Sequence, residues 1–238
     1  MKHIHFKTID STNTYIKNNY QSLDHMTIIS ADHQSQGRGR QKKVWYGDDN
    51  SIMCSILLKE HIESMNFHLL PLMAAKVLHR ILSKYLSDIK IKWPNDLLVH
   101  GLKLSGILVE SIFQDNKIQA IVIGFGINVN QKLFHDDIKE IATSLYQQTH
   151  KTYNKNQILN EIIIQIENDL NLLSHDKNQI IEYCNHHAEL TNRLIQFEHK
   201  QKRLDGKVLS INQDGHLLVL VEDQIHTIHS GEIIIKKT

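Results

Sequence analysis

The sequence predicts an α+β fold, in which a mixed, mostly antiparallel sheet is flanked by helices and followed by a small all-β unit. Short apolar runs with short links succeed one another over residues 90–127, and short links favour antiparallel neighbours. Residues 69–86 carry apolar side chains at the three-to-four spacing of a long amphipathic helix. From about Thr191 onward the pattern changes to short strands. The chain is therefore expected to contain one large helix-flanked sheet and one small β-structure.

The N-terminal elements come first. Residues 3–9 are predicted to form a strand. Ser11-Thr-Asn is predicted to open a helix that ends near Asn19, with Asp10 or Ser11 as its N-cap. Two strands are predicted next, at Met26–Ala31 and at Ser51–Lys59, and a loop rich in glycine and arginine separates them.

The middle of the chain begins with the long helix. Its apolar positions are 70, 73, 74, 77, 78, 81, 82 and 85. The predicted strands that follow it are Lys90–Trp93, Leu97–Val99, Ile107–Phe113 and Gln119–Ile127. Further helices are predicted at Ile138–Leu145, Asn156–Leu173 and Asp176–Glu189.

The C-terminal part is predicted to be a small β-barrel. Its expected strands are Arg193–Glu198, Lys202–Ile211, His216–Val221 and Ile225–His229, with a turn at Asn212-Gln-Asp-Gly215. We therefore expect two domains, residues 1–189 and residues 190–238.

Composition narrows the functional class. A net charge of +1 with 22% charged residues argues against a general nucleic-acid or membrane-surface binder. Cys54 and Cys184 give no disulfide framework, and no signal peptide or membrane-spanning apolar run is present, so a cytoplasmic location is expected. The 17 histidines are scattered without metal-binding spacing, which predicts no histidine-based metal site.

The most informative stretch is residues 90–110, where two strand-like runs bracket a turn. Pro94 fixes its own φ angle and favours an extended conformation for Trp93, so the chain must bend near Asn95 and Asp96. Lys103 leads directly into the second apolar run. Because a lysine is costly to desolvate there unless an anion meets it, this pattern indicates an anion site. An ordinary strand end, with Trp93 in the core, is the alternative.

A second cationic element is Gly37-Arg38-Gly39-Arg40. Interleaved glycines let the backbone approach a ligand closely, while guanidinium groups fork around phosphate or carboxylate oxygens. Taken alone, this segment is also compatible with a solvated basic loop or an RNA-binding arginine–glycine segment. Together with Lys103, it predicts a site for a polyanionic small molecule.

With these motifs in order, the chain resembles the biotin–protein ligases. The matching segments are Asp10-Ser-Thr-Asn13, Gln34, Gly37-Arg-Gly-Arg40, Trp45, Lys92-Trp-Pro-Asn-Asp96, Lys103-Leu-Ser-Gly-Ile-Leu-Val-Glu110 and Gly124-Phe-Gly-Ile-Asn128. The resemblance implies a sheet of the class II synthetase and biotin–lipoate ligase type, with an SH3-like C-terminal barrel. It covers essentially the whole chain, most strongly up to about residue 130.

The implied reaction converts biotin and ATP to biotinyl-5′-adenylate with release of pyrophosphate, and then moves biotin to a lysine of a carrier protein. The implied partners are Mg²⁺ and the biotin carboxyl carrier domain of a biotin-dependent carboxylase, and a homodimer is possible. Some members also carry an N-terminal DNA-binding module. Only ten residues precede Ser11, so we expect no such module and no DNA binding.

The resemblance also implies residue roles. Lys103 would contact both the biotin carboxylate and the α-phosphate, and Arg40 would act with it in catalysis. The implied biotin-binding residues are Ser11, Thr12, Asn13, Gln34, Arg38, Gly39, Arg40 and Lys103. The implied ATP-binding residues are Gly37, Arg38, Arg40, Trp45, Lys92, Asn95, Lys103 and Asn128. Asp96 is the implied magnesium ligand, helped by Asn95, while Trp93 and Glu110 are expected to be structural or supporting.

One segment departs from the family pattern. Lys42 and Lys43 stand where a glycine and an arginine are usual, and Tyr46–Ser51 lacks the usual Ser-Pro. Losing a glycine restricts the loop, which bears on how it closes over the adenylate. Two alternatives remain open: a lipoate–protein ligase, which usually carries Arg-Arg-x-x-Gly-Gly-Gly here, and a non-catalytic biotin- or nucleotide-binding protein.

Overall fold

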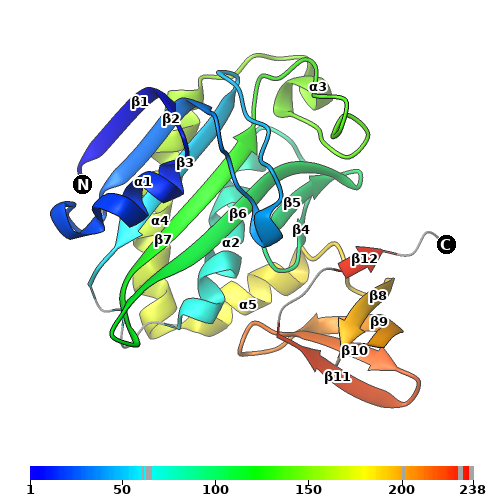
Figure 1. The fold of residues 1–238 in the computed structure, drawn as a ribbon. Helices are drawn as coiled ribbons and strands as arrows, with labels where there is room; N and C mark the ends of the chain where they lie inside the picture. Colours follow the sequence, from blue (N-terminus) through cyan, green and yellow to red (C-terminus); the bar gives the residue numbers. More distant parts are fainter. Residues whose placement is uncertain (61, 63–65, 200–201, 230–232, 236–238) are drawn as a thin grey trace.

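The N-terminal part of the chain forms a seven-stranded mixed sheet (Figure 1). The structure is a computed structural model that describes residues 1–60, 62, 66–199, 202–229 and 233–235. Its spatial order is β1-β2-β3-β7-β6-β5-β4. Only the edge pair β1–β2 is parallel among the pairs of this sheet, so the predicted mostly antiparallel α+β fold is confirmed. The strands are β1 His3–Ile9, β2 Ile28–Gln34, β3 Ser51–Leu58, β4 Ile89–Lys92, β5 Asp96–Val99, β6 Leu102–Gln114 and β7 Lys117–Asn128.

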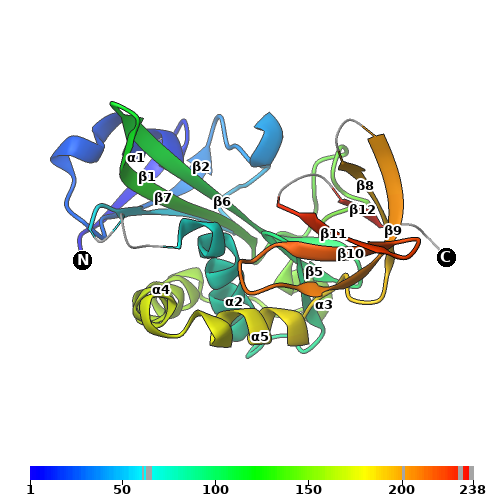
Figure 2. The same ribbon diagram turned by 90° about the horizontal axis from the view of Figure 1, so that it is seen from below.

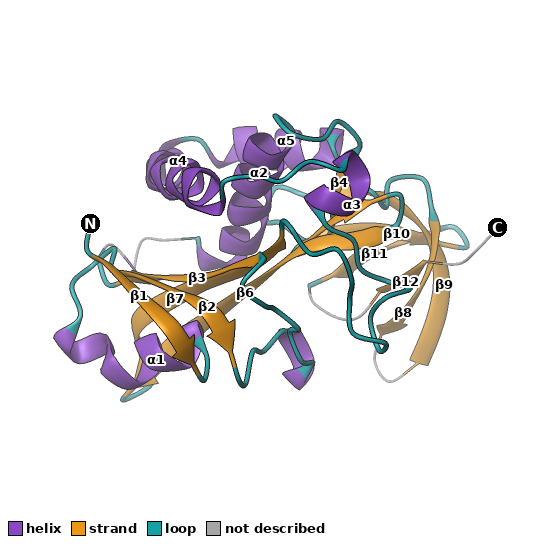
Figure 3. Ribbon diagram, turned by 90° about the horizontal axis from the view of Figure 1, so that it is seen from above, coloured by secondary structure: helices purple, strands orange, loops and turns teal. Residues whose placement is uncertain are grey.

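Helices cover both faces of this sheet. α2, α4 and α5 lie on one face and α1 lies on the other (Figure 3). The α-helices are α1 Thr12–Asn19, α2 Leu70–Leu82, α3 Leu145–Thr149, α4 Lys155–His175 and α5 Lys177–His186. Short 3₁₀ turns are η1 Tyr20–Ser22, η2 Arg40–Lys42 and η4 Phe67–Leu69. Ser11 is the N-cap of α1, because its side chain accepts from the backbone of Thr14.

The predicted helix at Ile138–Leu145 is wrong. Residues 138–141 form turns, and the helix α3 starts only at Leu145. The reason is local: Ser144 caps α3 by accepting a hydrogen bond from the Gln147 backbone at 3.0 Å. Ile141, one of the apolar residues behind the prediction, is 61% exposed.

The C-terminal part forms a five-stranded antiparallel sheet of order β11-β10-β9-β8-β12 (Figure 2). Its strands are β8 Leu194–His199, β9 Lys202–Ile211, β10 Leu217–Val221, β11 Gln224–Ile228 and β12 Ile233–Ile235. The small β-structure and its turn at residues 212–215 are confirmed, while the three-residue β12 was not predicted. Within the described strands β11 and β12 are the two edges and do not pair with each other.

The two sheets share one core. A single buried cluster contains Leu72 and Leu78 of α2 together with Phe197, Val208 and Val219 of the second sheet. A smaller cluster, including Ile16, lies beneath α1. Both cysteines are buried and free. No helix in the described ranges is long and apolar enough to cross a membrane.

Polar contacts also connect the two parts. The indole Nε1 of Trp93 donates to the Gly215 carbonyl at 2.8 Å. Asn185 of α5 pairs with the backbone of Ile211, donating to its carbonyl at 2.9 Å and accepting from its N–H at 2.7 Å. Trp93 immediately precedes the turn predicted to carry the site, so the small sheet packs directly behind that turn.

Candidate active site

The N-terminus of α1 brings three buried polar residues, Ser11, Thr12 and Asn13, onto the sheet. The backbone N–H of Thr12 donates to Gln34 Oε1 at 2.7 Å. The Thr12 hydroxyl also lies 3.1 Å from the same oxygen and 2.7 Å from the Ser55 hydroxyl. These contacts hold the end of β2 against the start of α1, and they leave the Gln34 amide nitrogen with no hydrogen-bond partner among the described residues.

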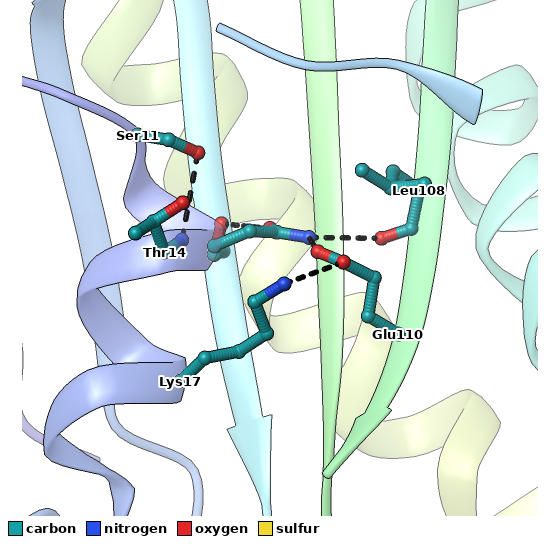
Figure 4. Close-up of polar contacts among 7 residues, drawn as sticks. Ser11, Thr14, Lys17, Leu108 and Glu110 are labelled. Carbon is teal, nitrogen blue, oxygen red and sulfur yellow. Dashed lines mark hydrogen bonds and ion pairs between the residues drawn. The ribbon is translucent and has the colours of Figure 1, made fainter. Parts of the chain in front are cut away.

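Asn13 is held entirely by protein groups. Its Nδ2 donates to Glu110 Oε2 at 2.8 Å and, more weakly, to the Leu108 carbonyl at 3.4 Å (Figure 4). Its Oδ1 accepts from the Ser55 hydroxyl at 2.5 Å. Lys17 pairs with the other carboxylate oxygen of Glu110 at 2.7 Å. The expected contact of Asn13 with a ligand therefore stays a prediction, whereas its contacts with Ser55 and Glu110 were not anticipated.

The glycine–arginine loop is closed by its own backbone. The N–H of Gly39 donates to the Lys43 carbonyl at 2.7 Å, and that of Trp45 donates to the Gly37 carbonyl at 3.0 Å. Gln41 takes a left-handed φ of 53°, so the strain falls next to Lys42, the position where the family usually has glycine. The side chain of Lys42 lies outside the described residues.

The ring of Trp45 packs against two glycines of the sheet, Gly106 of β6 and Gly126 of β7. A Cβ on Gly126 would stand 2.7 Å from the indole Nε1, and one on Gly106 would stand 3.3 Å from Cζ3. The indole N–H is buried with no hydrogen-bond partner among the described residues. Both glycines are needed because any larger residue would lift the ring off β6 and β7.

Lys103 and Asp96 meet directly. The Lys103 ammonium lies 2.8 Å from Asp96 Oδ1 and 5.9 Å from the centroid of the Trp45 ring. Their strands β5 and β6 are neighbours with an irregular register between Leu97 and Leu98. The turn therefore brings the predicted cation against the predicted metal ligand, in reach of the aromatic ring.

Arg40 joins the same group of residues from the loop. Its guanidinium donates to Asn95 Oδ1 at 3.1 Å, and Asn95 Nδ2 donates to the Ile107 carbonyl at 2.7 Å. Lys92 is the register partner of Asp96 across β4 and β5, and Arg38 is exposed in the loop. The structure thus gathers most of the predicted cationic residues around one turn.

Asn128 is engaged elsewhere. Its Nδ2 donates to the Thr143 carbonyl at 3.0 Å and to the Lys103 carbonyl at 3.3 Å, while its Oδ1 accepts from Gln131 at 3.3 Å. It therefore supports the backbone behind Lys103, and its expected contact with a nucleotide stays a prediction.

A cavity of about 340 Å³ opens on the loop side of Trp45. Besides Trp45 and Gln34, its wall includes Leu133, Phe134 and Ile138 from the segment after β7. The two rims of the cavity are joined by Tyr46, whose hydroxyl donates to Asp137 at 2.9 Å and whose ring stacks on His135 at 4.9 Å. The sequence carried no signal for this apolar wall, because its residues form no charged motif.

No cluster of three or more potential metal-ligating His, Cys, Asp or Glu side chains occurs within the described residues. Mg²⁺, however, is commonly held by one or two carboxylates together with substrate phosphates. Asp96, beside the amide of Asn95, fits that weaker requirement. The arrangement as a whole can bind a phosphate-bearing anion: it has fixed cations, a glycine floor and an aromatic wall beside a cavity.

Comparison with known proteins agrees with this geometry. The model of the biotin/lipoate A/B protein ligase family matches residues 5–128. The bifunctional ligase/repressor BirA of Bacillus spizizenii is 32% identical over 212 residues, which are 87% of this chain and 65% of that protein. The present chain thus spans about 65% of the length of that relative.

Shorter and structural relatives were found as well. A biotin–[acetyl-CoA-carboxylase] ligase of Paracoccus denitrificans is 30% identical over 123 residues, covering 50% of this chain and 51% of that one. The biotin protein ligase of Aquifex aeolicus in complex with biotin and ATP superposes with a TM-score of 0.88 at 26% identity, covering 100% of this chain and 99% of the other.

Proposed function

Because the chain belongs to the biotin/lipoate A/B protein ligase family, we propose that it is an ATP-dependent biotin–protein ligase. It forms biotinyl-5′-adenylate from biotin and ATP with release of pyrophosphate, and it then transfers biotin to a lysine of a carrier-protein domain with release of AMP. The observation that carries the proposal is the meeting of Lys103, Asp96 and Trp45 beside Arg40 and Asn95.

Adenylation requires positive charge where a carboxylate meets the α-phosphate, because two anions must approach each other. The Lys103 ammonium is already fixed by Asp96 and by the ring of Trp45, so little reorganisation is needed when charge develops. Arg40, held by Asn95, and Arg38 supply the guanidinium groups that orient the phosphate and carboxylate oxygens. The loop that carries Trp45 packs against Gly106 and Gly126, and it keeps water away from the mixed anhydride.

Binding of the two substrates is divided along the sheet. Ser11, Thr12 and Gln34 sit where the ureido ring of biotin is expected, and the Gln34 amide nitrogen is available as a donor. Trp45 with Leu133, Phe134 and Ile138 forms an apolar wall suited to the adenine ring. Support for this division comes from the polar character of the first group and the apolar character of the second.

Magnesium binding is assigned to Asp96, helped by Asn95. When bound, Mg²⁺ supplies charge neutralisation to the triphosphate. We predict that Asp96→Asn raises the magnesium concentration needed for half-maximal pyrophosphate release and weakens ATP binding, while biotin binding is not weakened, because the Lys103 ammonium is released from its counter-ion. Calorimetry that finds equal losses for biotin and ATP would show that Asp96 acts through Lys103 instead.

The acceptor is proposed to be the biotin carboxyl carrier domain of a biotin-dependent carboxylase. The name of the Paracoccus denitrificans relative supports this choice. We place the reaction in the cytoplasm, in keeping with the two free cysteines.

One incubation tests the proposal. The protein is mixed with ATP, an apo carrier domain and either biotin or lipoate, and the intact mass of the carrier is measured. We expect the mass of the carrier to increase by that of one biotinyl group in the incubation with biotin, and not to change in the incubation with lipoate. A lipoyl-sized gain would establish a lipoate ligase, and ligand binding without any gain would establish a non-catalytic binding protein.

A further inference from the structure

Glu110 occupies an unusual position for a residue expected to be merely supporting. It projects from β6 beneath α1, with one oxygen facing Asn13 and the other facing Lys17 (Figure 4). Among the described residues, neither Glu110 nor Lys17 makes a polar contact with the group of residues around Lys103. Both are joined to the expected biotin-binding residues only through Asn13.

The hydrogen bonds that start at Glu110 have one possible direction. A carboxylate accepts and does not donate, so Asn13 must turn its NH₂ toward Glu110 and its carbonyl toward Ser55. The Ser55 hydroxyl has one hydrogen, and the 2.5 Å contact with Asn13 Oδ1 takes it. Thr12 then accepts nothing from Ser55, and its own hydrogen goes either to the Ser55 oxygen at 2.7 Å or to Gln34 Oε1 at 3.1 Å.

This direction determines what Thr12 can offer. Because Thr12 accepts from neither Ser55 nor Gln34, whichever of them takes its hydrogen, its oxygen keeps its lone pairs for an incoming N–H donor. The neighbouring Gln34 has its oxygen held by the Thr12 backbone, which leaves its NH₂ as a donor. One acceptor beside one donor is the pattern that a cyclic urea, with N–H and C=O side by side, requires.

We propose that Glu110, together with Lys17, is a positioning residue of the biotin site: it sets the direction of the hydrogen-bond chain Thr12–Ser55–Asn13–Glu110 and thereby the donor and acceptor pattern presented to the ureido ring. The inference deepens the proposed function and rests on it for the identity of the ligand. The ion pair itself adds little stability, because both side chains are about a third exposed (33% and 29%).

Lys17 makes the proposal sharply testable. In Glu110→Gln, the ammonium of Lys17 takes the single amide oxygen, so the new NH₂ faces the NH₂ of Asn13. Asn13 must then turn around, and the chain reverses toward Thr12. Removing the ammonium as well, in Lys17→Met with Glu110→Gln, frees the amide to present its oxygen to Asn13 again and restores the native direction.

The experiment compares wild type, Glu110→Gln, Lys17→Met and the double variant in biotin-dependent pyrophosphate release. Glu110→Gln is expected to raise the KM for biotin about tenfold, in line with loss of one neutral hydrogen bond between the ureido ring and Thr12, with kcat and the KM for ATP unchanged. The double variant should return the KM for biotin close to wild type. A double variant as impaired as Glu110→Gln, or more so, overturns the proposal.

Two further variants serve as controls. Glu161→Gln makes the same chemical change at the remote Lys84–Glu161 ion pair and should leave all constants unchanged. Ser55→Ala interrupts the chain, so adding Glu110→Gln to it should raise the KM for biotin no further if Glu110 acts through Ser55. Additive increases would contradict the proposed chain.

A readout without substrate keeps the inference distinct from the function. The urea midpoint should fall in Glu110→Gln and recover in the double variant, because the clash of NH₂ groups exists in the free protein. A wild type that makes no biotinyl-adenylate overturns the proposed function, while recovery of the midpoint still supports the hydrogen-bond direction. An unchanged midpoint in Glu110→Gln refutes that direction whatever the activity.

Discussion

Lys103 is the residue on which the proposed chemistry depends most. Its ammonium is fixed by the Asp96 carboxylate at 2.8 Å, and Gly106 leaves room for its stem, since a Cβ there would stand 2.9 Å from Lys103 Cε. A cation held in this way before substrate arrives is electrostatically preorganised. The contribution of the Lys103 ammonium should therefore appear in the rate of adenylate formation.

We predict that Lys103→Ala lowers the rate of biotin-dependent pyrophosphate release about a hundredfold or more, equivalent to about 3 kcal/mol of transition-state stabilisation. Circular dichroism should show an intact fold, because the side chain is not part of the apolar core. Lys90→Ala, an exposed lysine on β4, is the matched control and should be near wild type. Near-normal release by folded Lys103→Ala protein would remove Lys103 from the mechanism.

At the scale of residues, the sequence predicted the groups whose chemistry is unusual for their position. Lys103 before a buried strand and Asp96 after Pro94 were identifiable, because charge at a strand end is costly without a partner. Ser55 and Glu110 were not identifiable as neighbours of Asn13. Glu110 is 97 residues away in the chain, and its approach depends on the packing of α1 against the sheet.

At the scale of elements, the floor beneath Trp45 is set by β6 and β7, while the loop that carries the ring is short and held by few backbone bonds. The family pattern of the loop could be read from the sequence. The position of the ring on Gly126 could not, because it depends on the pairing of Gly106 with Gly126 across two strands.

We predict that Gly126→Ala displaces the Trp45 ring, because the added methyl would overlap the indole. Acrylamide should quench indole fluorescence more strongly in this variant, while the signal from the buried Trp93 stays constant. Gly39→Ala is the matched control, since its Cβ would meet nothing closer than the Lys43 carbonyl at 3.6 Å. Equal quenching in both variants would show that the ring does not rest on Gly126.

The contact between α2 and α5 gives a pH dependence. Burial lowers the pKa of His79 to about 4, and its Nδ1 lies 2.9 Å from the Tyr183 hydroxyl. The unfolded chain has an ordinary histidine pKa of about 6.5. Above that value His79 is neutral in both states and its contribution to stability is complete; as the pH falls from about 6.5 to about 4, the unfolded state alone gains a proton and stability is lost.

In urea unfolding, the free energy of unfolding should therefore be lower at about pH 5 than at about pH 7.5, and His79 should contribute about 2 kcal/mol to this difference. His79→Gln should be less stable at the higher pH but should lose correspondingly less on acidification. The comparison isolates His79 from His187, whose pKa is also lowered by burial. An identical pH slope in both proteins would contradict a neutral buried His79.

At the scale of the whole molecule, the two sheets are not independent. Trp93 donates to the Gly215 carbonyl, Asn185 makes two hydrogen bonds with the backbone of Ile211, and one apolar cluster contains residues of both sheets. The sequence predicted the two β-structures and the turn at residues 212–215 correctly, because local periodicity and turn residues encode them. The boundary between residues 189 and 190 stays a prediction, and the shared core could not be read from local patterns.

We predict that the chain unfolds in a single cooperative transition in calorimetry. Gly215→Ala should lower its midpoint, because Gly215 has a φ of +83° and a Cβ there would stand 2.5 Å from Leu69 Cδ2. The strain alone costs about 1–2 kcal/mol. Gly101→Ala has a similar φ of +81° but open space, so it should cost less. Two separate transitions would show that the sheets fold independently.

The 2.8 Å contact between Lys103 and Asp96 makes each the counter-ion of the other. A divalent cation that takes the carboxylate releases the ammonium, and an anionic ligand that takes the ammonium releases the carboxylate. Binding of metal and of anion is therefore positively coupled, and thermodynamic reciprocity requires each to raise the affinity of the other by the same factor. The free protein is left with a paired, neutral centre in which neither charge attracts ligand strongly until its opposite arrives.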